Sequence, residues 1–169
     1  ADRILINGYT FADIRVSRPS AGSNDLLITF AGSTDSILVK NNMQSYIGTD
    51  IETVAFGDGS VYTMSQIKQL LVDQAGTDGN DTIEGTNAAE VITGGLGNDT
   101  LIGHEGKDTY VFHRSDGNDV VNDDGPEFGS SDTVLLRGYT LADLHVIKPS
   151  INSANIVLAF FSTADTIVL

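Results

Sequence analysis

The sequence contains no cysteine and few basic residues. Without cysteine, the chain can form neither disulfide bonds nor thiolate metal sites. Nine Lys and Arg residues stand against 23 Asp and Glu residues, which gives a formal net charge of −14 at pH 7. Such a chain has no cationic surface for phosphate groups, so nucleic acid and anionic membrane surfaces are not expected partners. No run of 18 apolar residues occurs either, and we expect no membrane span.

Length and apolar content predict a folded chain of ordinary globular type. The 169 residues suffice for one domain with a hydrophobic core, and the apolar share of 40% is close to globular usage. The first four residues, ADRI, show neither an initiator methionine nor a signal-peptide pattern, so we expect this chain to belong to a longer protein.

A nine-residue repeat occupies residues 76–111. Each copy carries one carboxylate at its sixth position: Asp81, Glu90, Asp99 and Asp108. The third copy, residues 94–102 (GGLGNDTLI), fits the pattern G-G-x-G-x-D-x-U-x at every fixed position. Each copy has only one to three large apolar residues, so it cannot be stabilised in the ordinary way by its own core. A hard divalent cation with oxygen ligands is the expected partner of these carboxylates.

The period also predicts how the copies stack. Nine residues divide into a six-residue turn, whose glycines permit positive dihedral angles, and a three-residue strand. The middle strand residues should all point to one side: Ile83, Ile92, Leu101 and Tyr110. Two copies make one coil of 18 residues, so the first and third turns stack on one edge and the second and fourth on the other. Facing carboxylates would repel each other, and we expect a calcium ion between stacked turns to offset that repulsion.

The repeat resembles the RTX (repeats-in-toxin) haemolysin-type calcium-binding family. The resemblance implies an all-β fold with a parallel β-roll that holds calcium between stacked turns. It also implies the ligands, which are backbone carbonyls at the first and third positions of a copy and the carboxylate at the sixth. Carried over to this chain, one edge uses Gly76, Asp78 and Asp81 with Gly94, Leu96 and Asp99, and the other uses Gly85, Asn87 and Glu90 with Gly103, Glu105 and Asp108.

The second copy departs from the family pattern. Residues 85–90 (GTNAAE) have Ala88 where the pattern has its next glycine and Glu90 where it has aspartate. A stiffer turn and a longer carboxylate favour weaker calcium binding on this edge than on the edge of Asp81 and Asp99.

Beyond the fourth copy the register changes, because Asp119 follows Asp108 by eleven residues. Residues 116–121 (DGNDVV) still have the character of a turn and a strand. We expect this turn to stack on the Asp99 turn and to add Asp116 and Asp119 to the ligands, for two or three calcium ions in all. Asp132 fits the pattern more loosely.

A second, longer repeat joins the two ends of the chain. Residues 2–39 align without a gap onto residues 132–169, at a constant offset of 130, with 14 of 38 positions identical. Most other core positions exchange Ile, Leu and Val, which keeps volume and pattern. We expect tandem units of about 130 residues in the parent protein, so neighbouring repeats of the same chain are expected partners.

The remaining segments predict short strands and one short helix. Strands are expected at residues 3–6, 14–16, 26–30, 36–39, 53–56 and 60–62. Thr63 with Gln66 forms a capping pattern that starts a short helix ending before Gly76. We therefore expect a β-rich segment over residues 1–75, the β-roll over 76–131, and a second copy of residues 2–39 over 132–169. The flanks also resemble segments that commonly accompany haemolysin-type repeats.

The predicted function is a calcium-binding module rather than an enzyme. No grouping of Ser, His and Asp stands out, and the paired carboxylates fall at stacking intervals rather than in a cleft. RTX resemblance implies a secreted bacterial protein that leaves the cell by type I export and folds on calcium outside it. Two alternatives stay open. One is a tandem adhesin or surface-layer segment that binds a carbohydrate or cell-surface ligand or self-associates, and the other is an accessory module of an exported hydrolase or epimerase.

Overall fold

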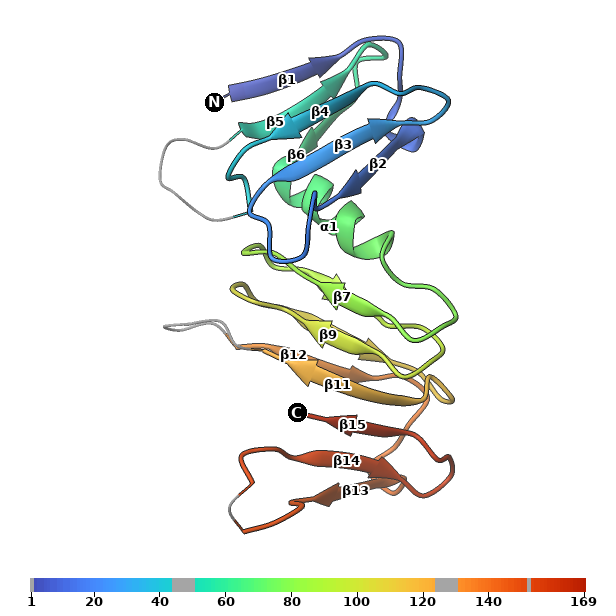
Figure 1. Cartoon of the computed structure of the whole chain (residues 1–169). Helices are drawn as coiled ribbons and strands as arrows, with labels where there is room; N and C mark the ends of the chain where they lie inside the picture. Colours follow the sequence, from blue (N-terminus) through green and yellow to red (C-terminus); the bar gives the residue numbers. More distant parts are fainter. Residues whose placement is uncertain (1, 44–50, 124–130, 152) are drawn as a thin grey trace. The chain divides into compact units, whose positions relative to one another are not determined.

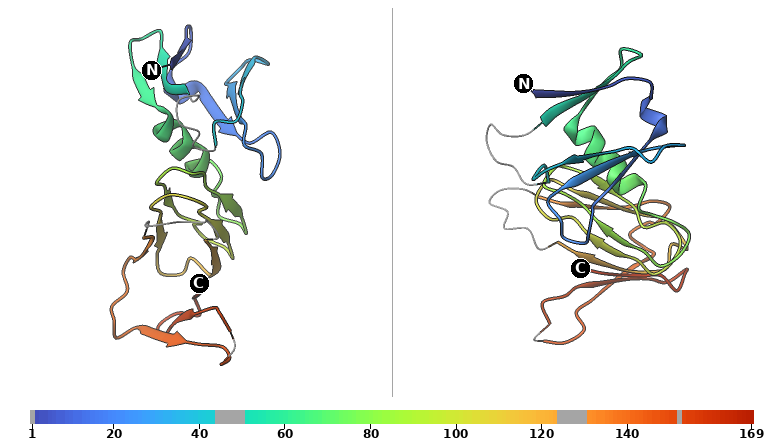
Figure 2. Two further views of the ribbon diagram at one scale, coloured as in Figure 1. Left: turned by 90° about the vertical axis from the view of Figure 1, so that its left-hand side faces the viewer. Right: turned by 45° about the horizontal axis from the view of Figure 1, so that its top comes forward.

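The computed structural model describes residues 2–43, 51–123, 131–151 and 153–169. The chain divides into two compact units, Ala1–Gln74 and Ala75–Leu169 (Figures 1 and 2). It is rich in strands and has one short α-helix in the described ranges, which confirms the predicted fold class. None of the helices in these ranges is both long and apolar enough to cross a membrane.

The first unit contains two small sheets. Its elements are β1 (Asp2–Ile6), η1 (Phe11–Asp13), β2 (Ile14–Ser17), β3 (Leu26–Phe30), β4 (Ser36–Val39), β5 (Ile51–Phe56), β6 (Val61–Thr63) and α1 (Met64–Asp73). One sheet has the order β1-β5-β6, with β1 parallel to β5, and the other is the antiparallel sheet β2-β3-β4. The predicted hairpins β3–β4 and β5–β6 are both present.

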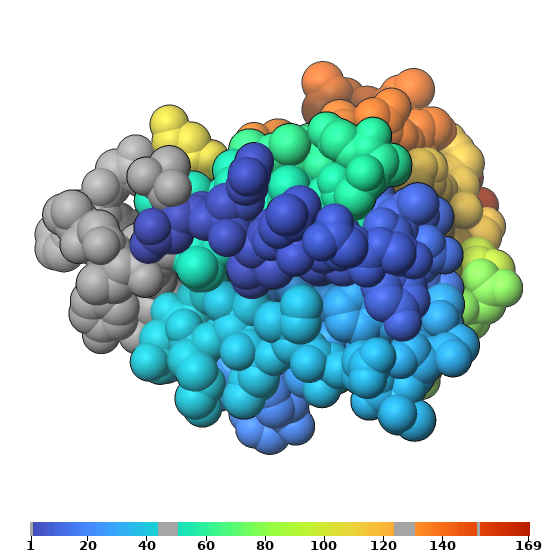
Figure 3. All heavy atoms as spheres, turned by 90° about the horizontal axis from the view of Figure 1, so that it is seen from above, coloured from blue at the N-terminus to red at the C-terminus, as the bar shows by residue number. Residues whose placement is uncertain are grey.

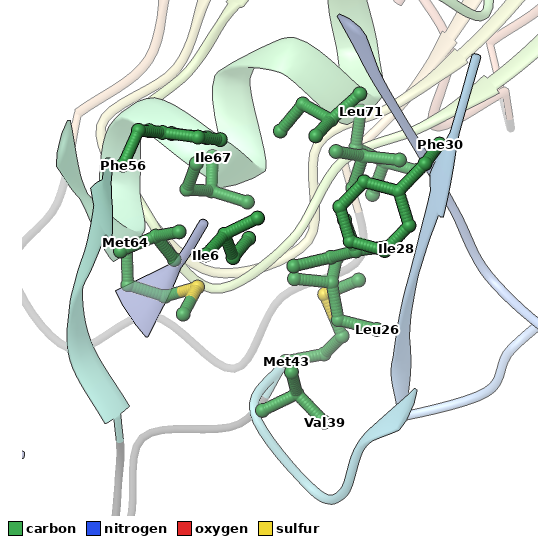
Figure 4. Close-up of a cluster of buried hydrophobic side chains, with 13 residues drawn as sticks. Ile6, Leu26, Ile28, Phe30, Val39, Met43, Phe56, Met64, Ile67 and Leu71 are labelled. Atoms are coloured by element: carbon green, nitrogen blue, oxygen red, sulfur yellow. The ribbon is translucent and has the colours of Figure 1, made fainter. Parts of the chain in front are cut away.

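Helix α1 and both sheets share one hydrophobic core (Figure 4). The helix starts at the predicted capping box, in which the Gln66 amide donates to the Thr63 hydroxyl and the Thr63 amide donates to the Gln66 side chain. Its buried residues Ile67 and Leu71 face strand residues of both sheets, among them Ile28 of β3 and Phe56 of β5. Burial of this apolar face holds the unit together.

The second unit begins with a parallel β-roll. Its strands are β7 (Thr82–Glu84), β8 (Val91–Ile92), β9 (Thr100–Ile102), β10 (Thr109–Phe112) and β11 (Asn118–Asn122). Strands β7, β9 and β11 pair in parallel in one sheet, and β8 pairs in parallel with β10 in another. The first and third turns therefore lie on one edge and the second and fourth on the other, as the 18-residue coil predicts. The predicted inward residues are fully or almost fully buried: Ile83, Ile92, Leu101 and Tyr110.

The segment after the roll has the same structure as the start of the chain. Its strands are β12 (Thr133–Leu136), β13 (Leu144–Ile147), β14 (Val157–Phe160) and β15 (Thr166–Val168). Strands β13, β14 and β15 pair in the register of β2, β3 and β4, displaced by 130 residues. Stacked rings also recur, because Tyr9 lies on Phe30 with centroids 4.4 Å apart and Tyr139 lies on Phe160 at 4.0 Å.

This second copy completes the roll. Strand β12 pairs in parallel with β10, and β15 pairs in parallel with β11, so both sheets of the roll continue into it (Figure 1). The resulting sheet orders are β12-β10-β8 and β13-β14-β15-β11-β9-β7.

Candidate metal centre

Stacked turns bring the predicted carboxylates together in two ladders. On the first edge, the Asp81 amide donates to Asp99 Oδ1 at 2.8 Å, and the Asp99 amide donates to Asp119 Oδ1 at 2.9 Å. The predicted stacking of the 116–121 turn on the Asp99 turn is thus observed. Asp99 and Asp119 thus each use one oxygen to hold the backbone of the turn one coil earlier.

The second edge repeats this arrangement. The Glu90 amide donates to Asp108 Oδ1 at 2.9 Å, and the Asp108 amide donates to Asp132 Oδ1 at 2.9 Å. Asp132 therefore takes the place on this edge that Asp119 takes on the other, although it follows Asp108 by 24 residues.

The other carboxylate oxygens differ in their hydrogen bonding between the first residue of each ladder, Asp81 or Glu90, and the second, Asp99 or Asp108. In the first members they are satisfied locally: Asp81 Oδ2 accepts from the Thr77 amide and hydroxyl at 2.6 and 2.8 Å, and Glu90 accepts from the Thr86 amide and hydroxyl. In the second members, Asp99 Oδ2 and Asp108 Oδ2 are buried and accept no hydrogen bond. A buried carboxylate oxygen without a partner is costly unless a cation or proton satisfies it.

Glycines make room for these two oxygens. A Cβ atom at Gly94 would collide with the Asp99 carboxylate, and one at Gly103 would collide with Asp108 Oδ2 and the Tyr110 hydroxyl. The first-position glycines also pack against carbonyls of the next coil, since a Cβ atom at Gly85 would lie 2.7 Å from the Gly103 carbonyl oxygen. The glycine pattern therefore brings carboxylate and carbonyl oxygens close together.

Burial and mutual repulsion disfavour charge on the inner carboxylates. Burial raises the pKa of Asp108 to about 7, and the charges of Glu90 and Asp132 act in the same direction. Burial likewise raises the pKa of Asp119 to about 6, with a contribution from Asp99. The pKa of Asp99 is also raised, mainly by burial. Its neighbours Asp81 and Asp116 add to that effect.

The other predicted ligands lie around the same turns but not in the ladders. Asp116 is buried, and its Oδ2 accepts from the His113 amide at 2.6 Å. The third-position side chains do not enter the ladders: Asp78, Leu96 and Glu105 are exposed and Asn87 is half-buried. Their predicted contribution is the backbone carbonyl, which does not require a buried side chain.

The candidate ligand atoms fit a hard divalent cation. Every side-chain ligand atom in the ladders is a carboxylate oxygen, the type that calcium prefers. Among the described residues, no three His, Asp or Glu side chains converge on a single metal position. A calcium ion next to Asp99 Oδ2 or Asp108 Oδ2 would therefore need backbone carbonyls to complete its coordination, as the repeat pattern predicts.

Sequence reasoning left two carboxylates out of the predicted ligand set. Asp132 ends the second ladder, and Asp165 accepts from the Ser115 amide at 2.7 Å beside the first. The dipeptide Asp-Thr at the start of a strand could have identified both. Asp132 and Asp165 precede threonine in this way, just as Asp99 and Asp108 do.

Comparison with known families agrees with this geometry. The family described as RTX calcium-binding nonapeptide repeat (4 copies) matches residues 75–110, and the haemolysin-type calcium binding protein related domain matches residues 25–66. No curated protein sequence matches the chain. Among solved structures, the crystal structure of extracellular lipase LipA from Serratia marcescens is similar with 18% sequence identity and a TM-score of 0.38, covering 99% of this chain and 32% of that one. This chain thus spans about a third of the length of that lipase. Residues 75–110 are therefore RTX haemolysin-type calcium-binding nonapeptide repeats, a structural module typical of secreted bacterial proteins.

Proposed function

We propose that the roll is a calcium-dependent folding module, and that its two carboxylate ladders each hold calcium between stacked turns. The unpartnered buried oxygens of Asp99 and Asp108 carry this proposal. Each lies at the centre of its ladder, where a divalent cation would supply the missing partner and offset the repulsion between stacked carboxylates.

The proposed ligands are those of the repeat pattern, with Asp132 added. The sixth-position carboxylates and the first- and third-position carbonyls would bind two or three ions in all. The roll, residues 76–131, is one part of the proposed organisation, between the flank 1–75 and the second copy 132–169. We propose no catalytic role for this segment.

The physical consequence is folding that depends on the compartment. Without calcium, the roll must bury several carboxylates close together or protonate them, which disfavours the folded state near neutral pH. Extracellular calcium modules bind at about 10⁻⁴ to 10⁻³ M, so such a roll would stay loose in a calcium-poor cytosol and fold after export. Secretion by a type I route and folding outside the cell follow as proposals from the family resemblance. The adhesin or surface-layer alternative stays a prediction.

The test is the response of the whole chain to calcium. Far-UV circular dichroism and thermal melting would be recorded in EGTA and in millimolar calcium, with millimolar magnesium as a control for ionic strength. We expect calcium to raise both the strand signal and the melting temperature. One ion at a concentration 100 times its Kd adds about 2.7 kcal/mol of stability. An unchanged spectrum and melting temperature would contradict the proposal.

A further inference from the structure

One interface in this chain joins a nonapeptide roll to a copy of the duplicated segment. In the second unit, β12 extends the sheet of β10 and β15 extends the sheet of β11. The second copy, residues 132–169, thus docks onto the open end of the roll through two strand edges.

The first copy, residues 2–39, has the same two strand edges without such partners. Strand β1 is the outer strand of the sheet β1-β5-β6, and β4 is the outer strand of β2-β3-β4. In the ranges that the structure describes, neither outer edge pairs with another strand. Figure 3 shows the face of the first unit that carries β1 in dark blue and the β3–β4 hairpin in light blue to cyan.

The hydrogen-bonding phase of β1 matches that of β12. The amides of Thr133 and Arg137 donate to β10, so residues at these alternate positions face the roll. In β1, the Ile6 carbonyl accepts from the Gly57 amide, so the residues at alternate positions from Ile6 face β5. The positions equivalent to Thr133 and Arg137 alternate with these and face away from β5. The edge of β1 that β5 leaves open is therefore the edge that β12 uses to bind a roll.

The phase of β4 matches that of β15 in the same way. The Thr166 amide donates to the Gly117 carbonyl of the roll. Strands β3 and β4 pair in the register of β14 and β15, with Thr29 opposite Ser36 as Ala159 is opposite Thr166. The Ser36 amide consequently points to the open edge of β4.

Side chains add a specific contact at the roll end. Arg114, between β10 and β11, donates to the Gly138 carbonyl and to Asp143 Oδ2, and its guanidinium lies 5.0 Å from the centroid of the Tyr139 ring. The neighbouring Ser115 amide donates to Asp165 Oδ2, which also accepts from the Tyr139 hydroxyl at 2.6 Å.

The Arg114 guanidinium also donates to the Ser162 hydroxyl, so the roll end contacts five positions of the second copy. The first copy has the same residues at four of them, Gly8, Tyr9, Asp13 and Asp35, and has Gly32 in place of the serine. Tyr9 and Asp13 also serve the fold of the copy itself, as the Tyr9–Phe30 stack and the Thr10–Asp13 hydrogen bonds show. Asp35 is different. Its equivalent Asp165 is 8% exposed at the interface with the roll, whereas Asp35 is exposed.

We propose that the open edges of β1 and β4, with Tyr9, Asp13 and Asp35, form a docking surface for the end of a nonapeptide roll. The occupant is a second copy of the roll, residues 75–123, placed as β10, β11 and Arg114 are placed on residues 132–169. Its Arg114 would meet the acidic pair Asp13 and Asp35, which gives charge complementarity. Tandem units would then form continuous sheets, each roll closed by the segment that follows it. The proposal goes beyond the proposed function and rests on it only in that calcium orders the docking roll.

The test extends the full chain with one more roll at the native spacing. Residues 75–131 are fused directly ahead of Asp2, as they precede Asp132 in the natural chain. Hydrogen exchange of backbone amides is then followed by NMR in calcium, for the extended and the unextended chain. We expect the amides of Asn7 and Ser36 to exchange at least about tenfold more slowly in the extended chain, because they acquire acceptors on the added roll. Arg137 and Thr166, which have those acceptors already, serve as internal references.

Two variants test the side-chain contact. In the extended chain, Asp35→Ala should lower the melting temperature of the added roll, as Asp165→Ala should lower that of the native one. Asp73→Asn, at an exposed carboxylate at the end of α1, is the charge-matched control and should change neither. Equal exchange of Asn7 and Ser36 in the two chains would overturn the docking proposal even where calcium still folds both rolls. Slowed exchange that needs no calcium would support docking and count against the proposed function.

Discussion

At the residue scale, the second position of each repeat decides whether its carboxylate is satisfied without a metal. Thr77 and Thr86 occupy this position in the first two copies, and each binds the carboxylate of its own turn. The third and fourth copies have Gly95 and His104 there instead. Asp99 and Asp108 consequently keep one buried oxygen without a hydrogen bond, and these oxygens are the candidate calcium contacts.

This difference gives a testable order of effects on calcium affinity. Asp99→Ala should weaken calcium binding by at least about tenfold, or about 1.4 kcal/mol, because it removes an oxygen that has no other partner. Glu90→Ala should have a smaller effect, since both of its oxygens accept from Thr86. Isothermal titration calorimetry measures both affinities. Equal losses would show that Glu90 releases Thr86 and binds calcium as strongly as Asp99.

The raised pKa values predict opposite effects of pH on the metal-free and calcium-bound chain. The pKa of Asp108 is about 7 and that of Asp119 about 6 in the folded chain. Both lie above the ordinary pKa of an aspartate side chain, about 3.9. Folding therefore takes up protons below about pH 7, and the metal-free roll should become more stable as pH falls from 8 to 5. Calcium must displace those protons, so its affinity should decrease over the same range.

Urea unfolding in metal-free buffer at pH 5 and pH 8 checks the first effect, and calcium titrations at the same pH values check the second. A metal-free roll that is more stable at pH 8 would mean that these carboxylates are not buried together in the absence of calcium.

At the scale of elements, the roll depends on very short strands, and β7, β8 and β9 each have a single buried residue. Leu101 of β9 is fully buried and lies between Ile83 of β7 and Val121 of β11 in the parallel register. Strands of two to five residues make few hydrogen bonds. The stack of inward side chains is thus the main apolar contribution of the roll, and it complements the ions at the turns.

Loss of one inward side chain should therefore destabilise the calcium-bound roll strongly. Leu101→Ala is expected to cost about 2–5 kcal/mol of unfolding free energy, as for other buried leucines. Leu96→Ala is the matched control, since its side chain is 49% exposed and only its carbonyl is a proposed ligand. That variant should stay within about 0.5 kcal/mol of the parent chain. Urea titrations in saturating calcium give both values, and similar costs would contradict the inward stack.

At the scale of the whole molecule, the two compact units differ in what stabilises them. The first unit has a hydrophobic cluster of aliphatic and aromatic side chains around α1. The second contains the carboxylate ladders and the roll, completed by a copy of the duplicated segment. A ligand that binds only the folded form of the second unit stabilises that unit by mass action.

Calcium should accordingly act on one unit. In NMR spectra recorded with and without calcium, we expect the amide signals of α1 and β3 to stay dispersed and nearly unshifted, while those of β7 to β15 become dispersed only with calcium. In thermal melts followed by the same signals, calcium should raise the transition of the second unit alone. Loss of the α1 signals on removal of calcium would show that the first unit requires the roll in order to fold.

The sequence by itself determined the local elements and the coil. The capping pattern of Thr63 and Gln66 placed the start of α1 because these side chains satisfy amides of their own first turn. The nine-residue period placed β7 to β10, since glycine permits the turns and alternation orients one residue of each strand inward. It likewise placed the carboxylates on two edges, because two copies make one coil. Calcium binding by these repeats was predicted on the same grounds.

Only the tertiary structure decided how the roll ends. After Asp108 the period is lost, and the strands that complete the sheets, β12 and β15, lie 24 and 48 residues beyond their partners β10 and β11. These pairings rest on backbone hydrogen bonds, which carry little sequence information, and on a few contacts such as that between Ser115 and Asp165. The duplication showed that residues 132–169 repeat residues 2–39, but not that one copy closes a roll while the other leaves the same edges open. That difference depends on which strand lies beside each edge, and the packing of the folded chain decides it.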